Sequence, residues 1–294
     1  MKDFSFWTEY EGASEGSGRS EKIWLMNPDT SQTGLFKMKK DAETTDHISE
    51  CIAYKLAELL NLSCARFELG TYLNREGSMS YNIIDSEGMI LIEGLSILSL
   101  AFPDYDPDKF VDEESGMRYS LEMIETSLKP FGLFNDFLNI PIFDYLIGNT
   151  DRHHSNWALI LKEDGKFCMS PLYDNSSSLC AYISKKKWDM YLGKDQTLWN
   201  SLVDTKSKSI IRINGSDKEK PTHLEVMKRL KNDYPIETKI LVDKIILNVT
   251  EDKIYAILEE YEDALLPDKK RQIIVWFLLS KVEMLKNLYL RKEE

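Results

Sequence analysis

Long apolar runs are absent from the sequence. The most apolar stretch, residues 273–279, is far shorter than the roughly 20 residues that a membrane-spanning helix needs. Residues 1–5 contain no apolar core of the kind found in secretory signals. We therefore expect a protein that neither crosses nor binds a membrane and that is located in the cytoplasm.

Cysteine is scarce, and the four cysteines do not lie close to one another in the sequence. They are Cys51, Cys64, Cys168 and Cys180. With the four histidines they form no zinc-binding spacing, which argues against a structural zinc site. Because Cys51, Cys64 and Cys168 lie in apolar patterns, we expect buried free thiols in a reducing compartment rather than disulfides.

Positive charge is also in short supply. The sequence has 37 Lys and Arg residues against 49 Asp and Glu residues, which gives a formal net charge of −12. A basic field that would attract phosphates is missing, so we expect no direct nucleic-acid binding. The three lysines at 185–187 are a local exception. They form either a solvated surface loop or a docking patch for an acidic substrate.

The rest of the composition is that of an ordinary globular protein. It is 43% hydrophobic and 29% charged, and 294 residues are enough for one large domain or two lobes. Strand-like patterns occupy residues 22–26 and 34–38. Residues 67–73 and 79–84 are interpreted as the two strands of a hairpin. The first 95 residues are therefore expected to be mainly β-structure.

Helical patterns begin within this region and dominate later. An N-cap at Thr45 and Asp46, followed by apolar residues at helical spacing, predicts a helix that ends near Asn61. Residues 102–117 are rich in carboxylates, and we interpret them as an exposed connection between two lobes. From His223 to the end, the apolar spacing predicts three or four helices.

The most informative segment runs from Gly148 to Ser176. It places Asp151 five residues before Asn156. Two apolar runs then follow, separated by a charged turn that ends in Gly165, and this pattern predicts a β-hairpin. A second Asp, Asp174, follows the hairpin. The hairpin would bring Asn156 and Asp174 together at its open end, with Asp151 just before it.

These residue types suit phosphoryl transfer. Asn156 and Asp174 supply the oxygen ligands that Mg²⁺ prefers, and Asp151 is a carboxylate that can orient and deprotonate an attacking hydroxyl. The spacing from Asp151 to Asn156 equals that of the protein-kinase catalytic loop, and Asp174 takes the place of the metal-binding Asp of that fold. The segment therefore predicts a kinase-type site.

The segment also resembles the signature of HipA-like serine/threonine kinases, the toxin halves of bacterial toxin–antitoxin pairs. The residues that carry the resemblance are 148–156 and 174–176, and upstream 17–25, 35–39 and 47–50. The resemblance implies an α+β, bilobal protein-kinase-like fold. It would have a small β-rich N-lobe at residues 1–95 and a larger helical C-lobe at residues 96–294.

The resemblance also implies a set of nucleotide-binding residues. The expected phosphate-binding loop contains Gly16, Ser17, Gly18 and Ser20, where small residues let backbone N–H groups approach the phosphates. A plain flexible loop is the alternative reading of this stretch.

On the strand, Lys37 alternates with Phe36 and Met38, so its side chain leaves the face that those two occupy. Lys37 would bind the phosphates, although Lys22 and Lys39 are alternatives. Glu50 would be the helix carboxylate that holds Lys37, and His153 would brace Asp151 by hydrogen bonding.

The function implied is that of an ATP- and Mg²⁺-dependent serine/threonine protein kinase, which could also phosphorylate serines of its own loop. The chain starts almost at that loop, as in the short stand-alone members, so an antitoxin-like regulator is only a secondary expectation. Two other readings stay open. One is a phosphatidylinositol-type lipid or small-molecule kinase, and the other is an inactive kinase-fold binding module.

Overall fold

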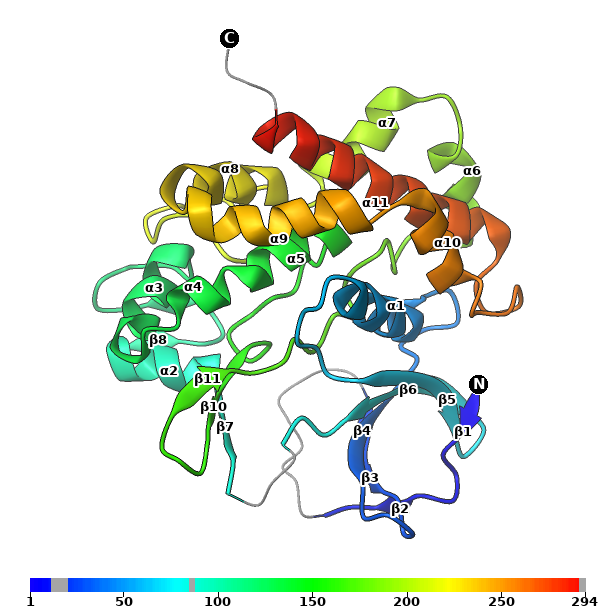
Figure 1. Cartoon of the computed structure of the whole chain (residues 1–294), viewed down its shortest axis with the longest axis horizontal. Helices are drawn as coiled ribbons and strands as arrows, with labels where there is room; N and C mark the ends of the chain where they lie inside the picture. Colours follow the sequence, from blue (N-terminus) through cyan, green and yellow to red (C-terminus); the bar gives the residue numbers. More distant parts are fainter. Residues whose placement is uncertain (12–20, 85–87, 291–294) are drawn as a thin grey trace.

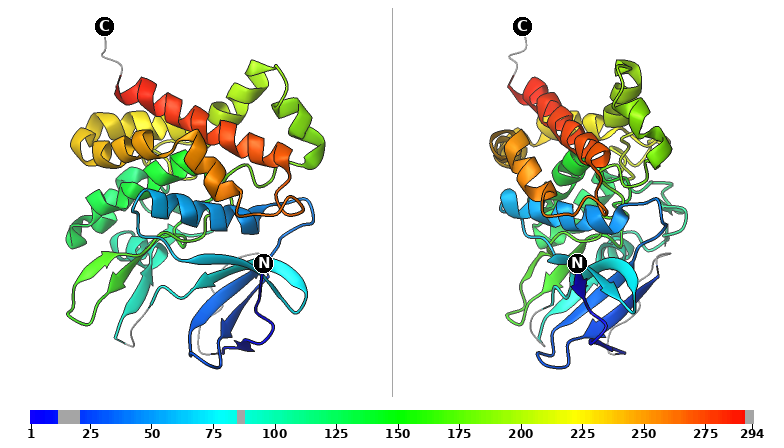
Figure 2. Two further views of the ribbon diagram at one scale, coloured as in Figure 1. Left: turned by 45° about the vertical axis from the view of Figure 1, so that its right-hand side comes forward. Right: turned by 90° about the vertical axis from the view of Figure 1, so that its right-hand side faces the viewer.

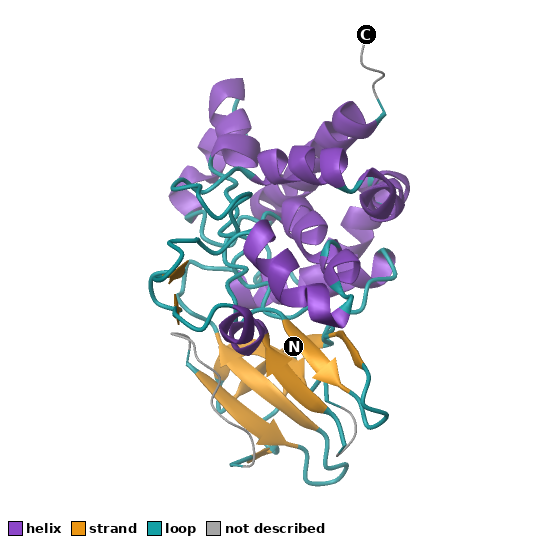
Figure 3. Cartoon of the chain, turned by 90° about the vertical axis from the view of Figure 1, so that its left-hand side faces the viewer, coloured by secondary structure: helices purple, strands orange, loops and turns teal. Residues whose placement is uncertain are grey.

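A computed structural model of the chain describes residues 1–11, 21–84 and 88–290. Figure 1 shows a β-rich part that contains the N-terminus and a helical part that contains the C-terminus. In Figure 3 the strands gather at one end of the molecule and the helices at the other. The sequence-based division at residue 95 stays a prediction.

Six strands form the sheet of the β-rich part, in the order β1-β5-β6-β4-β3-β2. Strand β1 pairs in parallel with β5, and the other neighbours are antiparallel. The strands are β1 (Lys2–Asp3), β2 (Thr8–Glu9), β3 (Lys22–Met26), β4 (Thr33–Met38), β5 (Phe67–Tyr72) and β6 (Arg75–Tyr81). The predicted hairpin is therefore present, with a turn at residues 73 and 74 that is tighter than expected.

The sheet has a hydrophobic core of its own, rich in aromatic residues. Strand β4 alternates as the sequence predicts: Phe36 and Met38 are buried in this core, and Lys37 lies on the other face. The full cluster is Phe4, Trp7, Leu25, Phe36, Met38, Tyr72, Met79 and Tyr81. This packing fixes the direction in which Lys37 leaves the strand.

One helix, α1 (Asp46–Leu59), packs against the sheet. Its residues Ile48, Ile52 and Leu56 belong to the main hydrophobic core, and it also contacts the helix α10. Figure 1 shows α1 between the sheet and the other helices. The helix is thus covered on both sides, and Glu50 is buried instead of solvated.

A second sheet links the two parts of the molecule. Its order is β11-β10-β7, with β7 (Ile90–Glu93), β10 (Ala158–Leu161) and β11 (Phe167–Met169). The β10–β11 hairpin is the one predicted from the sequence, and Leu159 pairs with Met169 across it. Strand β7 was not predicted, because its pairing with β10 joins segments far apart in the chain.

The acidic segment 102–117 does not connect the two parts. The chain leaves the six-stranded sheet after β6 and has already entered the second sheet at β7. Within the acidic segment, two short strands, β8 (Tyr105–Asp106) and β9 (Val111–Asp112), pair with each other. Tyr105 and Asp112 are buried, so the prediction of a plain exposed connection is wrong.

The helical part surrounds the buried helix α5 (Asn139–Ile147), which packs against α8, α9 and α11. Figure 2 shows these helices from two further directions. The other helices are α2 (Gly94–Ala101), α3 (Leu121–Leu128), α4 (Phe134–Phe137), α6 (Trp188–Tyr191), α7 (Gln196–Asn200), α8 (His223–Asp233), α9 (Pro235–Asn248), α10 (Glu251–Leu258) and α11 (Asp268–Tyr289). Short helical turns occupy η1 (Lys129–Phe131), η2 (Lys185–Lys187) and η3 (Ser201–Thr205).

The last four of these α-helices match the three or four that the sequence predicts after His223. None of the helices in the described ranges combines the length and the apolarity needed to cross a bilayer. All four cysteines are free, and only Cys51 is buried. The expectation of burial is wrong for Cys64 and Cys168, which are partly exposed.

Gly148 ends α5 and begins the loop with the Asp151 and Asn156 motif. Its φ of +66° lies in the left-handed region that favours glycine. A Cβ atom at this position would lie 2.6 Å from the ring of Phe277 in α11. The end of α5 and the side of α11 therefore meet with no room for a side chain.

We predict that Gly148→Ala lowers the free energy of unfolding more than Gly132→Ala. Gly132 has the same φ of +66° but open space where a Cβ would lie. The left-handed conformation alone should cost about 1 kcal/mol in each variant, and the clash with Phe277 should add about 1–3 kcal/mol at Gly148. Urea unfolding measures both values, and equal losses would contradict the close contact.

Candidate active site

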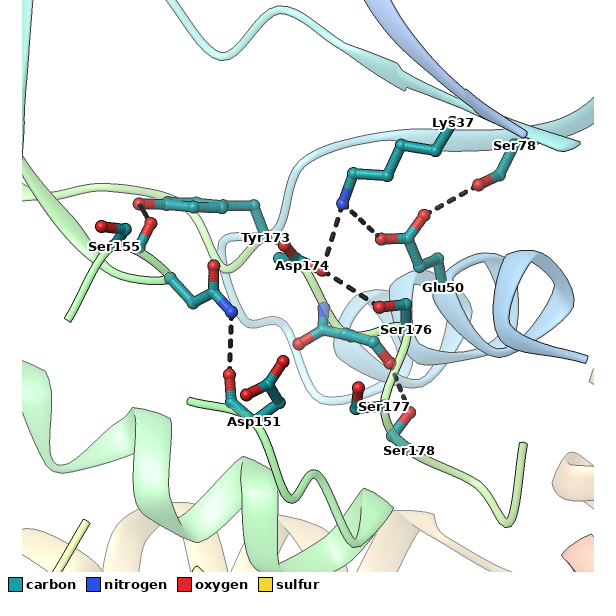
Figure 4. A network of polar contacts seen from close by, with 12 residues as sticks. Lys37, Glu50, Ser78, Asp151, Ser155, Tyr173, Asp174, Ser176, Ser177 and Ser178 are labelled. Carbon is teal, nitrogen blue, oxygen red and sulfur yellow. Dashed lines mark hydrogen bonds and ion pairs between the residues drawn. The ribbon is translucent and has the colours of Figure 1, made fainter. Parts of the chain in front are cut away.

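Three charged side chains from three distant segments meet at one point in the structure. Lys37 Nζ lies 2.8 Å from Glu50 Oε1 and 3.1 Å from Asp174 Oδ1. Ser78 Oγ donates a hydrogen bond of 2.8 Å to the other oxygen of Glu50. Figure 4 shows Lys37 between the two carboxylates. Strand β4, helix α1 and the segment after β11 are thus tied together by one ammonium group.

The charges of Lys37 and Asp174 support each other, whereas burial and the charge of Asp174 raise the pKa of Glu50. Burial alone would lower the pKa of Lys37, but Asp174 and Glu50 raise it well above its ordinary value. Burial alone would raise the pKa of Asp174, but Lys37 lowers it to about 2. The Lys37 ammonium and the Asp174 carboxylate are therefore both charged at neutral pH.

The backbone at Asp174 is left-handed, with a φ of +51°. Such a conformation is uncommon for a residue with a side chain, although Asp tolerates it better than most. Ser176 Oγ donates a 3.1 Å hydrogen bond to Asp174 Oδ1. The turn therefore has local support, and it directs the Asp174 carboxylate toward Lys37.

The loop that carries Asp151 and Asn156 is held by its own hydrogen bonds. Asn156 Nδ2 donates to the carbonyl oxygen of Asp151 at 2.8 Å. With the amide nitrogen used in this way, Asn156 Oδ1 remains available as a ligand for a cation. Asp151 is exposed and lines the larger cavity described below. Partial withdrawal from water raises its pKa, and the charge of Asp174 adds to this effect.

Arg152 holds the loop from behind, a role that the sequence alone did not assign. It is fully buried, and its Nε and Nη2 atoms donate to the two oxygens of Asp144 in α5 at 2.9 and 2.8 Å. Its Nη1 atom donates to the carbonyl oxygens of Asn156 and Tyr173, each at 2.6 Å. Nη2 also donates to Asn175 Oδ1 at 2.7 Å. One guanidinium therefore joins the loop to the segment that carries Asp174.

The two adjacent histidines behave differently from each other. Nδ1 of His153 accepts a 3.2 Å hydrogen bond from the backbone N–H of Ser155, and the backbone N–H of His153 donates to the carbonyl oxygen of Asp151 at 2.9 Å. The role of His153 as a brace for Asp151 stays a prediction. A positive charge on His153 would oppose the rise in the pKa of Asp151. His154 is buried against Tyr105 and Phe110, and burial lowers its pKa to about 4.

The remaining predicted residues divide into two groups. Gly16, Ser17, Gly18 and Ser20 lie outside the described residues. Of the two alternatives to Lys37, Lys39 pairs with Glu76 of strand β6 at 3.1 Å, whereas Lys22 lies opposite Lys37 in the β3–β4 pair. Lys37 is thus the lysine that meets a helix carboxylate, as the sequence suggested.

A small cavity of about 190 Å³ lies on one side of the cluster. It is bounded by Lys37, Asn156 and Asp174 and by a mostly apolar wall. Its apolar and aromatic residues are Trp24, Leu35, Tyr81, Ile83, Leu91 and Tyr173, and its other polar lining residues are Lys22, Ser80, Asn82, Glu93 and Ser155. The sequence did not identify the apolar and aromatic residues, because they come from separate strands and loops that meet only in the folded chain.

A larger cavity of about 560 Å³ lies on the other side, and it also includes Lys37 and Asp174. Asp151, His153 and Lys40 line it. The charged cluster therefore sits between an apolar cavity and a polar one, with Asp151 in the polar one.

Comparison with known proteins gives the family. The model of the HipA-like C-terminal domain matches residues 14–235. The chain belongs to the HipA-like family. Both this family and the mixed α+β fold, with a β-sheet N-terminal region and a helical C-terminal part, are as the sequence predicted. Family membership implies a phosphotransferase that uses ATP.

Two solved structures show the same fold as this HipA-like chain. One is the proinflammatory kinase CtkA of Helicobacter pylori, with 17% identity and a TM-score of 0.79 over 98% of this chain and 96% of CtkA. The other is a chain in the complex of HipA, HipB and operator DNA from Shewanella oneidensis MR-1. It has 12% identity and a TM-score of 0.55 over 97% of this chain and 69% of that one. No curated protein matches.

We predict that Arg152→Met lowers the free energy of unfolding by about 3–5 kcal/mol, because it leaves the buried carboxylate of Asp144 without its charged partner. Arg75→Met is the control. Arg75 is ion-paired with Glu21 at the surface, and its loss should cost less than about 1 kcal/mol. Urea unfolding compares the two. An Arg152→Met protein as stable as Arg75→Met would contradict the role of Arg152 as the support of the loop.

Proposed function

We propose that this HipA-like protein is a Mg²⁺-dependent serine/threonine protein kinase that transfers the γ-phosphoryl group of ATP to a protein hydroxyl. The observation that carries the proposal is the position of Lys37. It bridges Glu50 and Asp174 at 2.8 and 3.1 Å, beside the loop that carries Asp151 and Asn156. A lysine paired with a helix carboxylate is the arrangement that protein kinases use to hold ATP phosphates.

The two cavities suit the two ends of the nucleotide. The apolar wall around Trp24 and Tyr173 is suited to a flat base, and the polar side at Lys37 is suited to phosphates. The expected loop at residues 16–20 would cover the phosphates. In this arrangement the triphosphate extends from the small cavity toward Asp151.

The donor set beside the cluster fits a hard divalent cation. Asp174 offers a charged carboxylate and Asn156 a neutral amide oxygen, and Mg²⁺ prefers such oxygen ligands in combination with phosphates. Bound there, Mg²⁺ would neutralise charge on the β- and γ-phosphates.

Asp151 is the residue we assign to the acceptor hydroxyl. Its carboxylate faces the polar cavity, and its raised pKa makes it a better proton acceptor than a fully solvated Asp. It would take the hydroxyl proton as the acceptor oxygen bonds to the γ-phosphorus. The bond from that phosphorus to the bridging oxygen then breaks, and ADP leaves. Arg152 would keep Asp151 in register with Asp174 throughout.

Serines of the 12–20 segment are candidate acceptors in the protein itself, as the family resemblance implies. We also propose that an antitoxin-like protein could regulate the kinase, since the Shewanella oneidensis complex contains HipB. Separate protein substrates are expected to present Ser or Thr at the polar cavity.

We predict that Asp151→Ala lowers kcat by about 10²–10⁴-fold but leaves Mg·ATP affinity within about twofold, because the carboxylate acts on the acceptor and not on the nucleotide. Labelled ATP with protein and lipid acceptors measures transfer, and calorimetry measures affinity. Intact-mass spectrometry of the same samples reports autophosphorylation.

Each outcome of this experiment has a distinct meaning. Transfer to lipid but not to protein would replace the proposal with a lipid kinase. Nucleotide binding with no transfer to either acceptor or to itself would indicate an inactive binding module. A fully active Asp151→Ala protein would remove Asp151 from the base role.

We predict that Asp174→Ala abolishes the effect of Mg²⁺ on ATP affinity, because Asp174 would be the charged protein ligand of the ion. Asp164→Ala is the control, since Asp164 lies exposed in the turn between β10 and β11. Calorimetric titration of ATP with and without Mg²⁺ measures the effect. An unchanged Mg²⁺ effect in Asp174→Ala would exclude this residue as a ligand.

A further inference from the structure

A buried chain of polar groups runs from α11 to the catalytic loop. Lys281 Nζ donates to Ser207 Oγ at 2.9 Å. Ser207 Oγ lies 3.0 Å from Nδ1 of His223 in α8. His223 Nε2 lies 2.8 Å from the carbonyl oxygen of Asn149. All four residues are buried, and none of them belongs to the site described above.

Stability does not account for Lys281. The lysine is completely buried, and its ammonium makes a single hydrogen bond within the described part of the chain, to Ser207. The rings of Tyr145 and Phe277 lie 4.6 and 5.3 Å from the ammonium and compensate in part for its lost water. A buried charge of this kind is costly, and an apolar residue of similar volume is often as stable or more so.

The donor and acceptor roles along this series of hydrogen bonds show how the charge of Lys281 affects His223. The carbonyl oxygen of Asn149 can only accept, so the ring of His223 must carry a hydrogen on Nε2. The Lys281 ammonium can only donate. It therefore occupies a lone pair of Ser207 Oγ and leaves the hydrogen of that hydroxyl for His223 Nδ1. A neutral ring that accepts at Nδ1 has its hydrogen at Nε2, where Asn149 needs it.

The Ser207 carbonyl oxygen also lies 2.9 Å from His223 Nδ1. A ring that took the proton from Lys281 would donate to both carbonyl oxygens, and Nε2 would still carry a hydrogen. Whether the positive charge resides on Lys281 or on His223, Nε2 of His223 therefore donates to the carbonyl oxygen of Asn149. Without that charge, the single hydrogen of the ring is free to move to Nδ1 and bind the Ser207 carbonyl, and Asn149 loses its donor.

The proton resides on Lys281 in preference to His223. Burial lowers the pKa of Lys281 to about 7, and the carboxylate of Asp204 opposes this effect. Burial, with the charge of Lys281 in addition, lowers the pKa of His223 to about 3. The ring is thus the weaker base of the two and stays neutral.

Asn149 connects the hydrogen bond from His223 to the backbone of Asp151. Its Nδ2 atom donates to Asp144 Oδ1 at 3.0 Å, and its Oδ1 atom accepts from the backbone N–H of Asp151 at 3.2 Å. Asn149 is therefore fixed through its side chain by α5 and through its carbonyl oxygen by His223. A shift of Asn149 would move the backbone from which the Asp151 carboxylate projects.

We propose that Lys281, Ser207 and His223 form a relay that positions the catalytic loop, with Lys281 setting the hydrogen-bonding direction of His223. None of the three touches the reacting atoms, so they are positioning residues. The proposal rests on the kinase function proposed above.

The first test is Lys281→Met, with Lys270→Met as the matched control. Lys270 is also completely buried in α11, but it donates to the carbonyl oxygen of Cys180, and no hydrogen bond among the described residues joins it to the relay. We expect Lys281→Met to keep or raise the melting temperature, to leave the Mg·ATP Kd within twofold, and to lower kcat roughly tenfold. Lys270→Met should keep kcat within twofold of the wild type.

Ser207→Ala cuts the relay at a small side chain and leaves both helices in place, so it should give the same loss of kcat as Lys281→Met. It also provides the measurement if Lys281→Met does not fold. A kcat within twofold of the wild type in Ser207→Ala, or in folded Lys281→Met, would overturn the proposal.

A double-mutant cycle separates positioning from general packing. In His223→Gln the side-chain amide can donate to the carbonyl oxygen of Asn149 independently of the orientation of the Ser207 hydroxyl. In His223→Leu the side chain has no donor. We expect His223→Gln to retain most of kcat, His223→Leu to lose it, and Lys281→Met to have less than a twofold effect in the His223→Gln background. A full tenfold loss in that background would show that Lys281 acts by another route.

The same assays distinguish the two proposals from each other. A wild-type protein without phosphoryl transfer would remove the proposed function and this relay with it. An active wild type with an equally active Lys281→Met protein would remove only the relay.

Discussion

The buried guanidinium of Arg152 is the interaction on which the geometry of the site depends. It binds the Asp144 carboxylate in α5 and, at the same time, backbone oxygens of the catalytic loop and of the segment that carries Asp174. Without it, two irregular segments would have to be placed by loop packing alone. Because loops leave backbone polar groups to be satisfied, one donor-rich side chain at their junction fixes both. Asp151 and Asp174 are therefore held in constant relative positions against the helix α5.

The second constraint is the ammonium of Lys37, which joins the β-rich part to this junction. The core of the sheet faces away from the cleft and leaves Lys37 pointing into it, and α1 brings Glu50 to meet it. Asp174 completes the cluster from the helical part of the chain. Removal of Lys37 would leave two carboxylates without their counter-charge. Because Lys37 and Asp174 line both cavities, the nucleotide cavity and the acceptor cavity depend on the same ion pair.

Features set by local patterns could be predicted from the sequence. The β10–β11 hairpin, the direction of Lys37 and the spacing of Asp151 and Asn156 all follow from turn residues and from short-range alternation. Features that depend on the meeting of distant segments could not. Arg152, Lys281 and His223 are polar residues with no apolar pattern to show that they are buried. Strand β7 pairs with β10 across more than sixty residues. The acidic residues of segment 102–117 suggested exposure, although Tyr105 folds under them onto His154.

The most direct test of this account is a crystal structure with Mg²⁺ and a non-hydrolysable ATP analogue. We predict that the base lies against Trp24 and Tyr173, that the metal is bound by Asp174 and the Oδ1 atom of Asn156, and that the γ-phosphate faces Asp151. A nucleotide bound elsewhere, or a metal that does not contact Asp174, would contradict the assignment of this cleft as a kinase active site.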